Sequence, residues 1–273
     1  MRKKYVFYFA SLVLSAALHQ TWSQTQQHVS YFGNLKIDWD KDPLDIQPEI
    51  IPEMGNIIPQ YANDGAHDEF GRMVLNITDD VVYNKFGEAF GSLNVNYGSS
   101  PENVIIPFPN STCKYIILST FNNPGFSNST NATIADLTAN SNHGSLNLMW
   151  NTPVQYSKYR DIVVGTLNSN NERFFYLLDI EPSFHNNPNL TLRSFKITSS
   201  GTITSVGSVL IPGLHIDNET ISEAELSFNG DEINLVDGSN KIHRIYINPS
   251  TGSLNTTVGT GGYSIYSIQS ING

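Results

Sequence analysis

A short acidic segment near the N-terminus has the residue spacing of a calcium-binding loop. Carboxylates stand at Asp38, Asp40 and Asp42, and Glu49 follows eleven residues after Asp38. Calcium is a hard cation that takes several oxygen ligands, which positions 1, 3, 5 and 12 of a tight loop can supply. Position 6 of such a loop normally has a positive φ, which Pro43 cannot adopt. The segment therefore predicts either a calcium site, the only cofactor considered, or a strand at Asp38 followed by a solvated acidic connection.

A second group of carboxylates lies in the C-terminal third, at Asp217, Glu219, Glu223 and Glu225. Two carboxylates can act as acid and nucleophile in glycoside hydrolysis, but the distance between them decides that reaction. The first three positions have the composition of a loop, and Glu225 precedes an apolar residue of a predicted strand. A plain surface cluster is therefore the favoured interpretation.

Other nucleophiles and metal ligands are sparse. The seven histidines include no pair at the spacing of a zinc site, and the chain lacks a Gly-x-Ser-x-Gly elbow and a phosphate-binding Gly-x-x-x-x-Gly-Lys loop. Cys113 is the single cysteine, so no disulfide can form within the chain. Because an Ile- and Leu-rich segment follows it, we expect a buried, inert thiol. The sequence therefore predicts that the chain is not an enzyme.

The elements that would position these residues are short β-strands. Apolar segments are rich in β-branched and aromatic residues, often alternate with polar ones, and are separated by Asn-Gly, Asp-Gly and Thr-Gly steps typical of turns. Charged residues make up only 15% of the chain, and Asn, Ser, Thr and Gly are abundant. We expect an all-β protein with scarcely a helix, and its clearest strands at 72–77, 115–119, 174–178, 192–197 and 242–247.

These strands recur in sets. Residues 223–254 contain a strand, a turn at Phe228-Asn229-Gly230-Asp231, a strand at 232–236, a further turn and a strand at 241–247, followed by a turn into another strand. Four short strands in this length are typical of one propeller blade. Similar patterns occur around 173–206 and 70–88. We therefore predict a β-propeller with WD40- or YVTN-like blades over residues 24–273, with the completeness of its last blade left open.

The N-terminus has the features of an export signal. Three basic residues, an apolar run from Tyr5 to Leu18 and a small-x-small pattern at Thr21-Trp22-Ser23 predict a signal peptide over residues 1–23. The alternative is a membrane anchor, but about 14 apolar residues are fewer than the roughly 20 that span a bilayer. The sequence thus predicts a secreted or cell-surface protein without membrane insertion after cleavage.

Net charge restricts the partners. The whole chain carries −10, and loss of residues 1–23 with their three bases and no acids makes this −13. Nucleic acid is therefore not an expected partner, because phosphate binding needs clustered Lys and Arg. Glycans and surface proteins remain as expected partners.

The sequence resembles a family, the N-terminal propeller-like region of cell-surface proteins that Bacteroidota export through the type IX secretion system. The matching motifs follow the family's order along the mature chain: Tyr31-Phe32-Gly33 with Lys36-Ile37-Asp38-Trp39, then 71–87, 104–109 with 115–118, 134–137, 170–175 and 226–230. Two departures are Asp80, where the family usually has Gly, and the end at Gly273, without immunoglobulin-like repeats or a C-terminal sorting domain. The latter suggests either a truncated product or a stand-alone propeller.

The resemblance implies a binding or adhesion module at the cell surface, acting as a monomer or as part of a larger chain. The alternative is a propeller-based extracellular hydrolase or lyase that acts on glycans, with or without calcium, because propellers host both kinds of function.

Overall fold

The computed structural model describes residues 29–32, 35–38, 49–51, 63–68, 72–93, 103–121, 128–154, 158–180, 190–211, 224–227, 229–236 and 242–259. The chain divides into two compact units, residues 1–93 and residues 94–273. In both units the regular secondary structure of the described residues is almost entirely β-strand, in antiparallel sheets, so the all-β prediction is confirmed.

The N-terminal unit contains two sheets. Sheet A has three strands in the order β1-β2-β3, and sheet B has four in the order β4-β5-β6-β7. Their bounds are β1 Val29–Phe32, β2 Leu35–Asp38, β3 Glu49–Ile50, β4 Asn63–His67, β5 Met73–Thr78, β6 Val81–Asn84 and β7 Ala89–Ser92. The turn between β5 and β6 is Asp79-Asp80, as the sequence predicted, and Asp79 adopts a φ of 58°.

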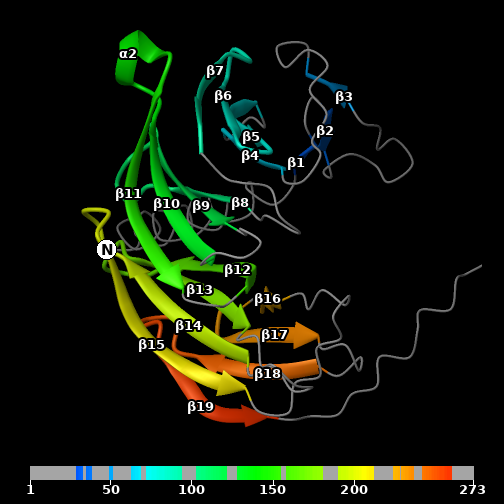
Figure 1. The fold of residues 1–273 in the computed structure, drawn as a ribbon, viewed down its shortest axis with the longest axis vertical. Helices are drawn as coiled ribbons and strands as arrows, with labels where there is room; N and C mark the ends of the chain where they lie inside the picture. The colour runs from blue at the N-terminus through cyan, green and yellow to red at the C-terminus, as the bar shows by residue number, and fades with distance from the viewer. Residues whose placement is uncertain are drawn as a thin grey trace, which may run out of the picture. The chain divides into compact units, whose positions relative to one another are not determined.

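The C-terminal unit contains three four-stranded sheets, each built from strands consecutive in the chain (Figure 1). Sheet C consists of β8 Asn103–Pro107, β9 Lys114–Phe121, β10 Asn128–Asp136 and β11 Ser145–Val154. Sheet D consists of β12 Lys158–Leu167, β13 Arg173–Ile180, β14 Leu190–Ile197 and β15 Ile203–Ile211. Sheet E consists of β16 Ala224–Leu226, β17 Glu232–Val236, β18 Ile242–Ile247 and β19 Leu254–Gly259.

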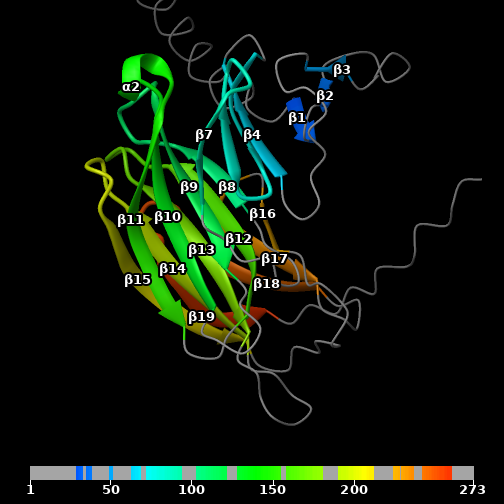
Figure 2. The same ribbon diagram turned by 45° about the horizontal axis from the view of Figure 1, so that its top comes forward.

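Sheet D lies between sheets C and E, and both of its faces are buried (Figure 2). Successive residues of a strand point to opposite faces, and β13 is apolar at both phases of this alternation. Phe174 and Tyr176 pack in the core shared with sheet E, whereas Phe175 and Leu177 pack in the core shared with sheet C. A strand with apolar side chains on both faces can bury them only if another layer packs on each side of its sheet.

An aromatic group joins sheets C and D. Trp150 of β11 meets the rings of Phe175 and Phe195 edge-on, at centroid distances of 6.0 and 5.2 Å. Phe175 and Phe195 are cross-strand neighbours of β13 and β14, and their rings stack at 5.1 Å. Aromatic pairs in these geometries contribute beyond the area that they bury.

The outermost strand of sheets B, C and D contains a bulge. One extra residue interrupts the register of each final strand pair, namely Phe90 in β7, Met149 in β11 and Val206 in β15. Met149 and Val206 turn onto the neighbouring apolar cores. Bulges of this kind bend an edge strand and break its row of free backbone groups.

The tip of the β10–β11 hairpin is the short segment α2, Ala139–Asn142. Asn140 and Ser141 have positive φ values of 51° and 59°, so this segment does not continue as a right-handed helix. A run of small polar residues is its only signal in the sequence.

Strand positions agree closely with the prediction where turn signals bound them. The strand predicted at 232–236 is β17 to the residue, the strand predicted at 242–247 is β18, and the pattern around 70–88 contains β5 and β6. The first strand of sheet D, β12, and the outer strands β7 and β11 were not predicted. The sets of four strands are thus present as separate sheets, and a closed propeller is not shown by the part of the chain that the structure describes.

Candidate functional site

The predicted calcium ligands are only partly within the described residues. Asp38 ends β2, in agreement with the strand interpretation, while Asp40 and Asp42 lie outside the described residues. Glu49 is exposed in β3 and lies opposite Lys36 in the β2–β3 register. Among the residues that the structure describes, no three metal-ligating side chains form a group that could hold an ion. The calcium site remains a prediction.

The second acidic group also lies only partly within the described residues. Asp217, Glu219 and Glu223 lie outside the described residues, and Glu225 is an exposed residue of β16. Its cross-strand partner is Asn234 of β17.

The prediction for Cys113 was wrong. Its thiol is exposed, and Sγ lies 3.6 Å from the hydroxyl of Thr112. The apolar strand begins one residue later, at Lys114, so Cys113 belongs to the β8–β9 turn. Thr112 and Cys113, at the end of this turn, are exposed, unlike the strand that follows.

Asn76-Ile77-Thr78 has the Asn-x-Thr pattern of a glycosylation site, and Asn76 lies in the strand predicted at 72–77. Asn76 is fully buried in β5, and Thr78 donates its hydroxyl to the Asn76 side-chain oxygen at 2.9 Å. A glycan cannot be accommodated on this side chain in the folded protein.

The first and third turns of sheets D and E carry many of the polar contacts of the described residues. In an antiparallel meander the first and third turns lie at the same end, and contacts between the sheets bring these turns together. Gly201 of the β14–β15 turn packs on Phe108 of the β8–β9 turn, and Gly252 of the β18–β19 turn packs on Phe174. We call this region the turn surface; its main residues are Asn168, Asn170, Glu172, Thr198, Ser200, Thr202, Asn229, Asp231, Asn248 and Ser250.

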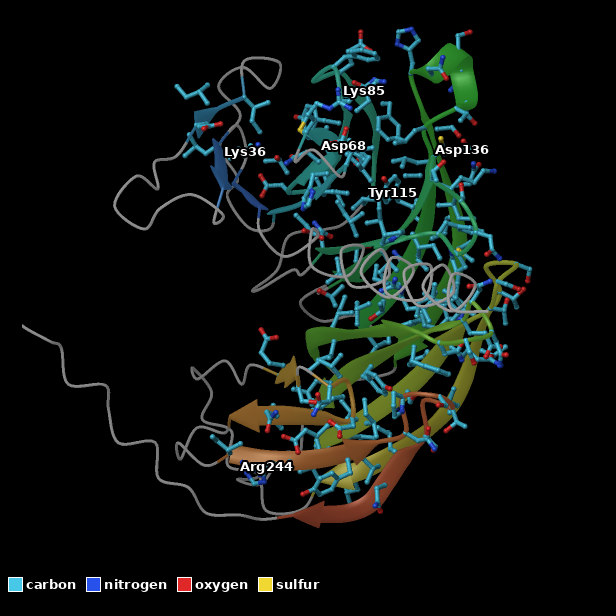
Figure 3. The ribbon with its side chains drawn as sticks, turned by 180° about the vertical axis from the view of Figure 1, so that it is seen from behind. Lys36, Asp68, Lys85, Tyr115, Asp136 and Arg244 are labelled. Atoms are coloured by element: carbon cyan, nitrogen blue, oxygen red, sulfur yellow. The ribbon has the colours of Figure 1, made fainter. Side chains whose placement is uncertain are left out.

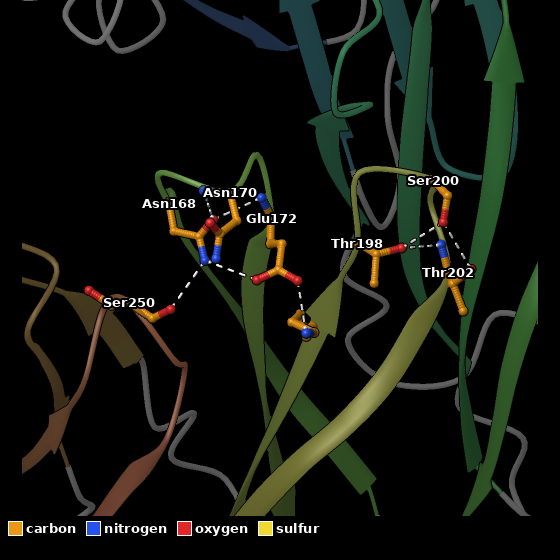
Figure 4. A network of polar contacts seen from close by, with 8 residues as sticks. Asn168, Asn170, Glu172, Thr198, Ser200, Thr202 and Ser250 are labelled. Carbon is orange, nitrogen blue, oxygen red and sulfur yellow. Dashed lines mark hydrogen bonds and ion pairs between the residues drawn. The ribbon is translucent and has the colours of Figure 1, made fainter.

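The β12–β13 turn is fixed by a single asparagine (Figure 4). Asn168 Oδ1 accepts hydrogen bonds from the backbone N–H groups of Asn170 and Glu172, both at 2.9 Å. Its Nδ2 donates to Glu172 at 3.1 Å and to the carbonyl of Ser250, also at 3.1 Å. One side chain thus closes its own turn and connects sheet D to sheet E.

The same arrangement recurs in the N-terminal unit. Asn84 Oδ1 accepts from the N–H groups of Phe86 and Glu88, and Nδ2 donates to Glu88 at 3.0 Å. Gly87 and Asn171 occupy the matching positive-φ position, at 74° and 56°. The sequence signal, Asn followed four residues later by Glu before a strand, was present in both turns but was not used in the prediction.

Hydroxyl groups fix the β14–β15 turn. Thr198 Oγ1 accepts from the N–H of Thr202 at 3.0 Å and lies 2.9 Å from the Ser200 hydroxyl (Figure 4). Behind the turn, Ser194 is buried and donates to the carbonyl of Gly252 at 2.6 Å. The turn surface is therefore held in place by local bonds and by contacts between the sheets.

Two ion pairs set the charge of this surface. Lys114 and Asp136 are cross-strand partners with a 2.9 Å contact, and the hydrogen bonds from Lys114 and then Thr138 lower the pKa of Asp136 to about 2. Lys196 lies 2.8 Å from Glu172, and hydrogen bonds from Lys196 and then Asn168 lower the pKa of Glu172. Both carboxylates are therefore ionised at neutral pH.

The turn surface continues onto sheet E at Tyr246. This residue is 45% exposed near the end of β18, opposite Glu232, the first residue of β17. Ile247 N–H donates to the carbonyl of Asp231 at 2.8 Å and fixes β18 against the β16–β17 turn. The sequence predicted Tyr246 only as a strand residue. The signal for its exposure is its alternation with the buried residues Ile245 and Ile247.

Within the described ranges the structure contains no helix with the length and hydrophobicity of a membrane span.

Comparison with known proteins adds no family. No protein-family model matches the chain, and none of the curated proteins matches it either.

Proposed function

We propose that the chain is a secreted or cell-surface binding module whose sheets are the blades of a propeller-like scaffold and whose turn surface engages glycans or surface proteins. Support for the scaffold is the series of consecutive four-stranded sheets, of which sheet D is buried on both faces. Support for export is the signal-like N-terminus, and the resemblance to type IX-secreted surface proteins favours adhesion.

The observation that carries the proposal is the preorganisation of the turn surface. Its amide and hydroxyl groups are presented by turns that side chains such as Asn168 and Thr198 lock to the backbone. A rigid β scaffold with polar turns at one end is a common basis for recognition, because little conformational entropy is lost when a ligand binds. Hydroxyl and amide groups match the hydrogen-bonding groups of glycans and of protein surfaces.

Arginine substitutions on exposed turn residues test the proposal. Ser199→Arg with Asn229→Arg places two bulky cations on the turn surface, at positions that are exposed. Ser208→Arg with Leu210→Arg is the matched control, because both residues are exposed on the outer strand β15 of sheet D. We expect the purified protein to bind immobilised glycans or intact cells, the turn variant to lose this binding and the control to retain it.

Two results would contradict the proposal. One is an absence of binding to both glycans and cells by the unmodified protein. The other is equal binding by the turn variant and the control, provided that both unfold at the same temperature as the unmodified protein.

A further inference from the structure

The face of sheet E that points away from sheet D is polar, in contrast to its inner face. On β17, Ile233 and Leu235 are fully buried against sheet D, so the intervening Glu232 and Asn234 lie on the other face. On β18, Ile245 and Ile247 are buried in the same core, and Arg244 and Tyr246 alternate with them. We call this second face the outer face; its polar and aromatic residues are Glu225, Glu232, Asn234, Arg244 and Tyr246, and Ile242 lies on it at the far end of β18 from Tyr246 (Figure 3, which labels Arg244).

The residues of the outer face form two cross-strand rows. Glu225, Asn234 and Arg244 are successive partners across β16, β17 and β18. Glu232 and Tyr246 are partners in the row beside it, at the end of the sheet that meets the turn surface. Partners in a row lie within about 5.5 Å of one another, so a single small ligand can contact several of them.

Tyr246 presents an aromatic ring on a fixed backbone. The residue is 45% exposed, while its neighbours Ile245 and Ile247 are 0% and 7% exposed and hold the strand in the core. Tyrosine supplies a large amphipathic contact area with few rotatable bonds, and its ring can stack against an apolar surface of matching size.

Hydrogen-bonding groups surround the ring. Asn234 Nδ2 donates a hydrogen bond to Glu232 Oε1 at 3.3 Å. This contact orients the other carboxylate oxygen of Glu232 and the side-chain carbonyl oxygen of Asn234. The row also contains a guanidinium, from Arg244, and a further carboxylate, from Glu225. The outer face of sheet E thus carries negatively charged acceptors, a positively charged donor and a neutral amide.

This combination fits a neutral sugar chain. The ring of a hexose or pentose has an apolar C–H face that can stack on tyrosine, and hydroxyl groups at its edge that pair with carboxylates, amides and guanidinium groups. A polyanion is disfavoured, because the carboxylate of Glu232 is the direct cross-strand partner of Tyr246 and the chain carries a net charge of −10.

We infer that the outer face of sheet E is a subsite for a neutral polysaccharide, with one sugar ring stacked on Tyr246 and its hydroxyl groups bound by Glu232 and Asn234. The inference rests on the proposed function. It adds the ligand class and the residues of the outer face, beside the turn surface, that bind the ligand.

Affinity electrophoresis of the purified protein tests the inference. The gels contain, one at a time, xyloglucan, galactomannan, mixed-linkage β-glucan or dextran as neutral probes, and alginate as the anionic probe. We expect at least one neutral polysaccharide to retard the protein, and alginate to leave its migration unchanged. Tyr246→Ala should weaken the interaction about tenfold, which corresponds to about 1.4 kcal/mol, because the stacked ring is lost. Tyr246→Phe keeps the ring and should retain the retardation.

Phe86→Ala is the matched control. Phe86 is an aromatic residue that is 54% exposed on a turn of the N-terminal unit, so its removal should not alter the retardation. Retardation by no neutral probe, retardation by alginate alone, or equal retardation of the protein and its Tyr246→Ala variant would overturn the inference.

The same gels separate this inference from the proposed function. If Tyr246→Ala retains glycan or cell binding that Ser199→Arg with Asn229→Arg abolishes, the ligand binds at the turns alone, and only the inference fails. If the unmodified protein binds intact cells but none of the neutral polysaccharides, the partner is a protein or another surface component, and again the inference alone fails.

Discussion

Sheets D and E share one core but differ in their second faces. Sheet D is apolar on both sides, and consecutive residues of β13 enter two different cores. Sheet E has its buried apolar core only on the side of sheet D, and its outer face carries mainly polar residues, namely Glu225, Glu232, Asn234 and Arg244, together with Tyr246 and Ile242. A sheet buried on both faces has an interior role, whereas a polar outer face is a feature of a terminal, solvated or ligand-binding position. The position of a sheet can therefore be read from whether one or both phases of its strands are apolar.

The largest expected effects come from a comparison of neighbouring residues on β13 and β17. Leu177→Ala and Leu178→Ala remove fully buried side chains from opposite faces of sheet D, and each should cost about 2–5 kcal/mol of unfolding free energy. On sheet E, Ile233→Ala should cost a similar amount, while Asn234→Ala should change stability by about 0.5 kcal/mol or less.

Urea denaturation of the four variants measures this pattern. A cost for Asn234→Ala as large as that for Ile233→Ala would mean that the outer face is packed against another element. The contrast between the two sheets would then not hold.

A smaller effect is expected where the two sheets meet at their turns. Gly252 has a φ of 70°, and a Cβ atom there would lie 2.1 Å from the ring of Phe174. Gly252→Ala should therefore cost about 2 kcal/mol, from overpacking and from the left-handed backbone.

Gly207→Ala provides the control, because a Cβ at Gly207 meets no atom within 4 Å. Thermal melting should show a clear decrease in Tm for the first variant and little change for the second. Equal melting temperatures would show that the contact between sheets D and E at Gly252 is not a tight one.

The smallest expected effect is electrostatic and lies on sheet C. The pKa of Asp136 is lowered to about 2 by hydrogen bonds from Lys114 and Thr138, below the roughly 3.9 of an unfolded chain. The ion pair therefore stabilises the fold above about pH 5, and its contribution is lost as the pH falls towards 2. Because the pair is partly exposed, the effect should stay below about 1 kcal/mol.

Denaturation of the protein and its Asp136→Asn variant between pH 7 and pH 2 tests the sign. The difference in stability between them should be largest near neutral pH and should shrink on acidification. Lys114→Met should reduce the same pH dependence. A difference that grows towards low pH would contradict the assignment of the carboxylate as the stabilising form.

Much of the fold could be predicted because turn chemistry and alternation agreed. β17 is bounded by Asn229-Gly230 on one side and has buried Ile233 and Leu235 at alternate positions, so its limits were predicted to the residue. β10 and β11 are rich in Asn, Ser and Thr, and β12 begins with charged residues, so propensity alone did not define these strands. They pair because neighbouring strands supply the register.

The candidate site was less predictable. Which face of a strand meets another sheet depends on contacts between residues far apart in the chain, as between Phe174 and Gly252. Cys113 was misassigned because an apolar strand begins one residue after it. The exposure of Tyr246 could be inferred only in part, from its alternation with Ile245 and Ile247.

The interrupted outer strands have a consequence for crowding. Proteins displayed densely on a surface approach one another edge to edge, and a straight, unpaired strand would allow neighbouring molecules to zip together through their main chains. Phe90, Met149 and Val206 each displace the outermost strand of their sheet from the regular register. The bulges therefore disfavour strand-to-strand pairing between copies of this protein.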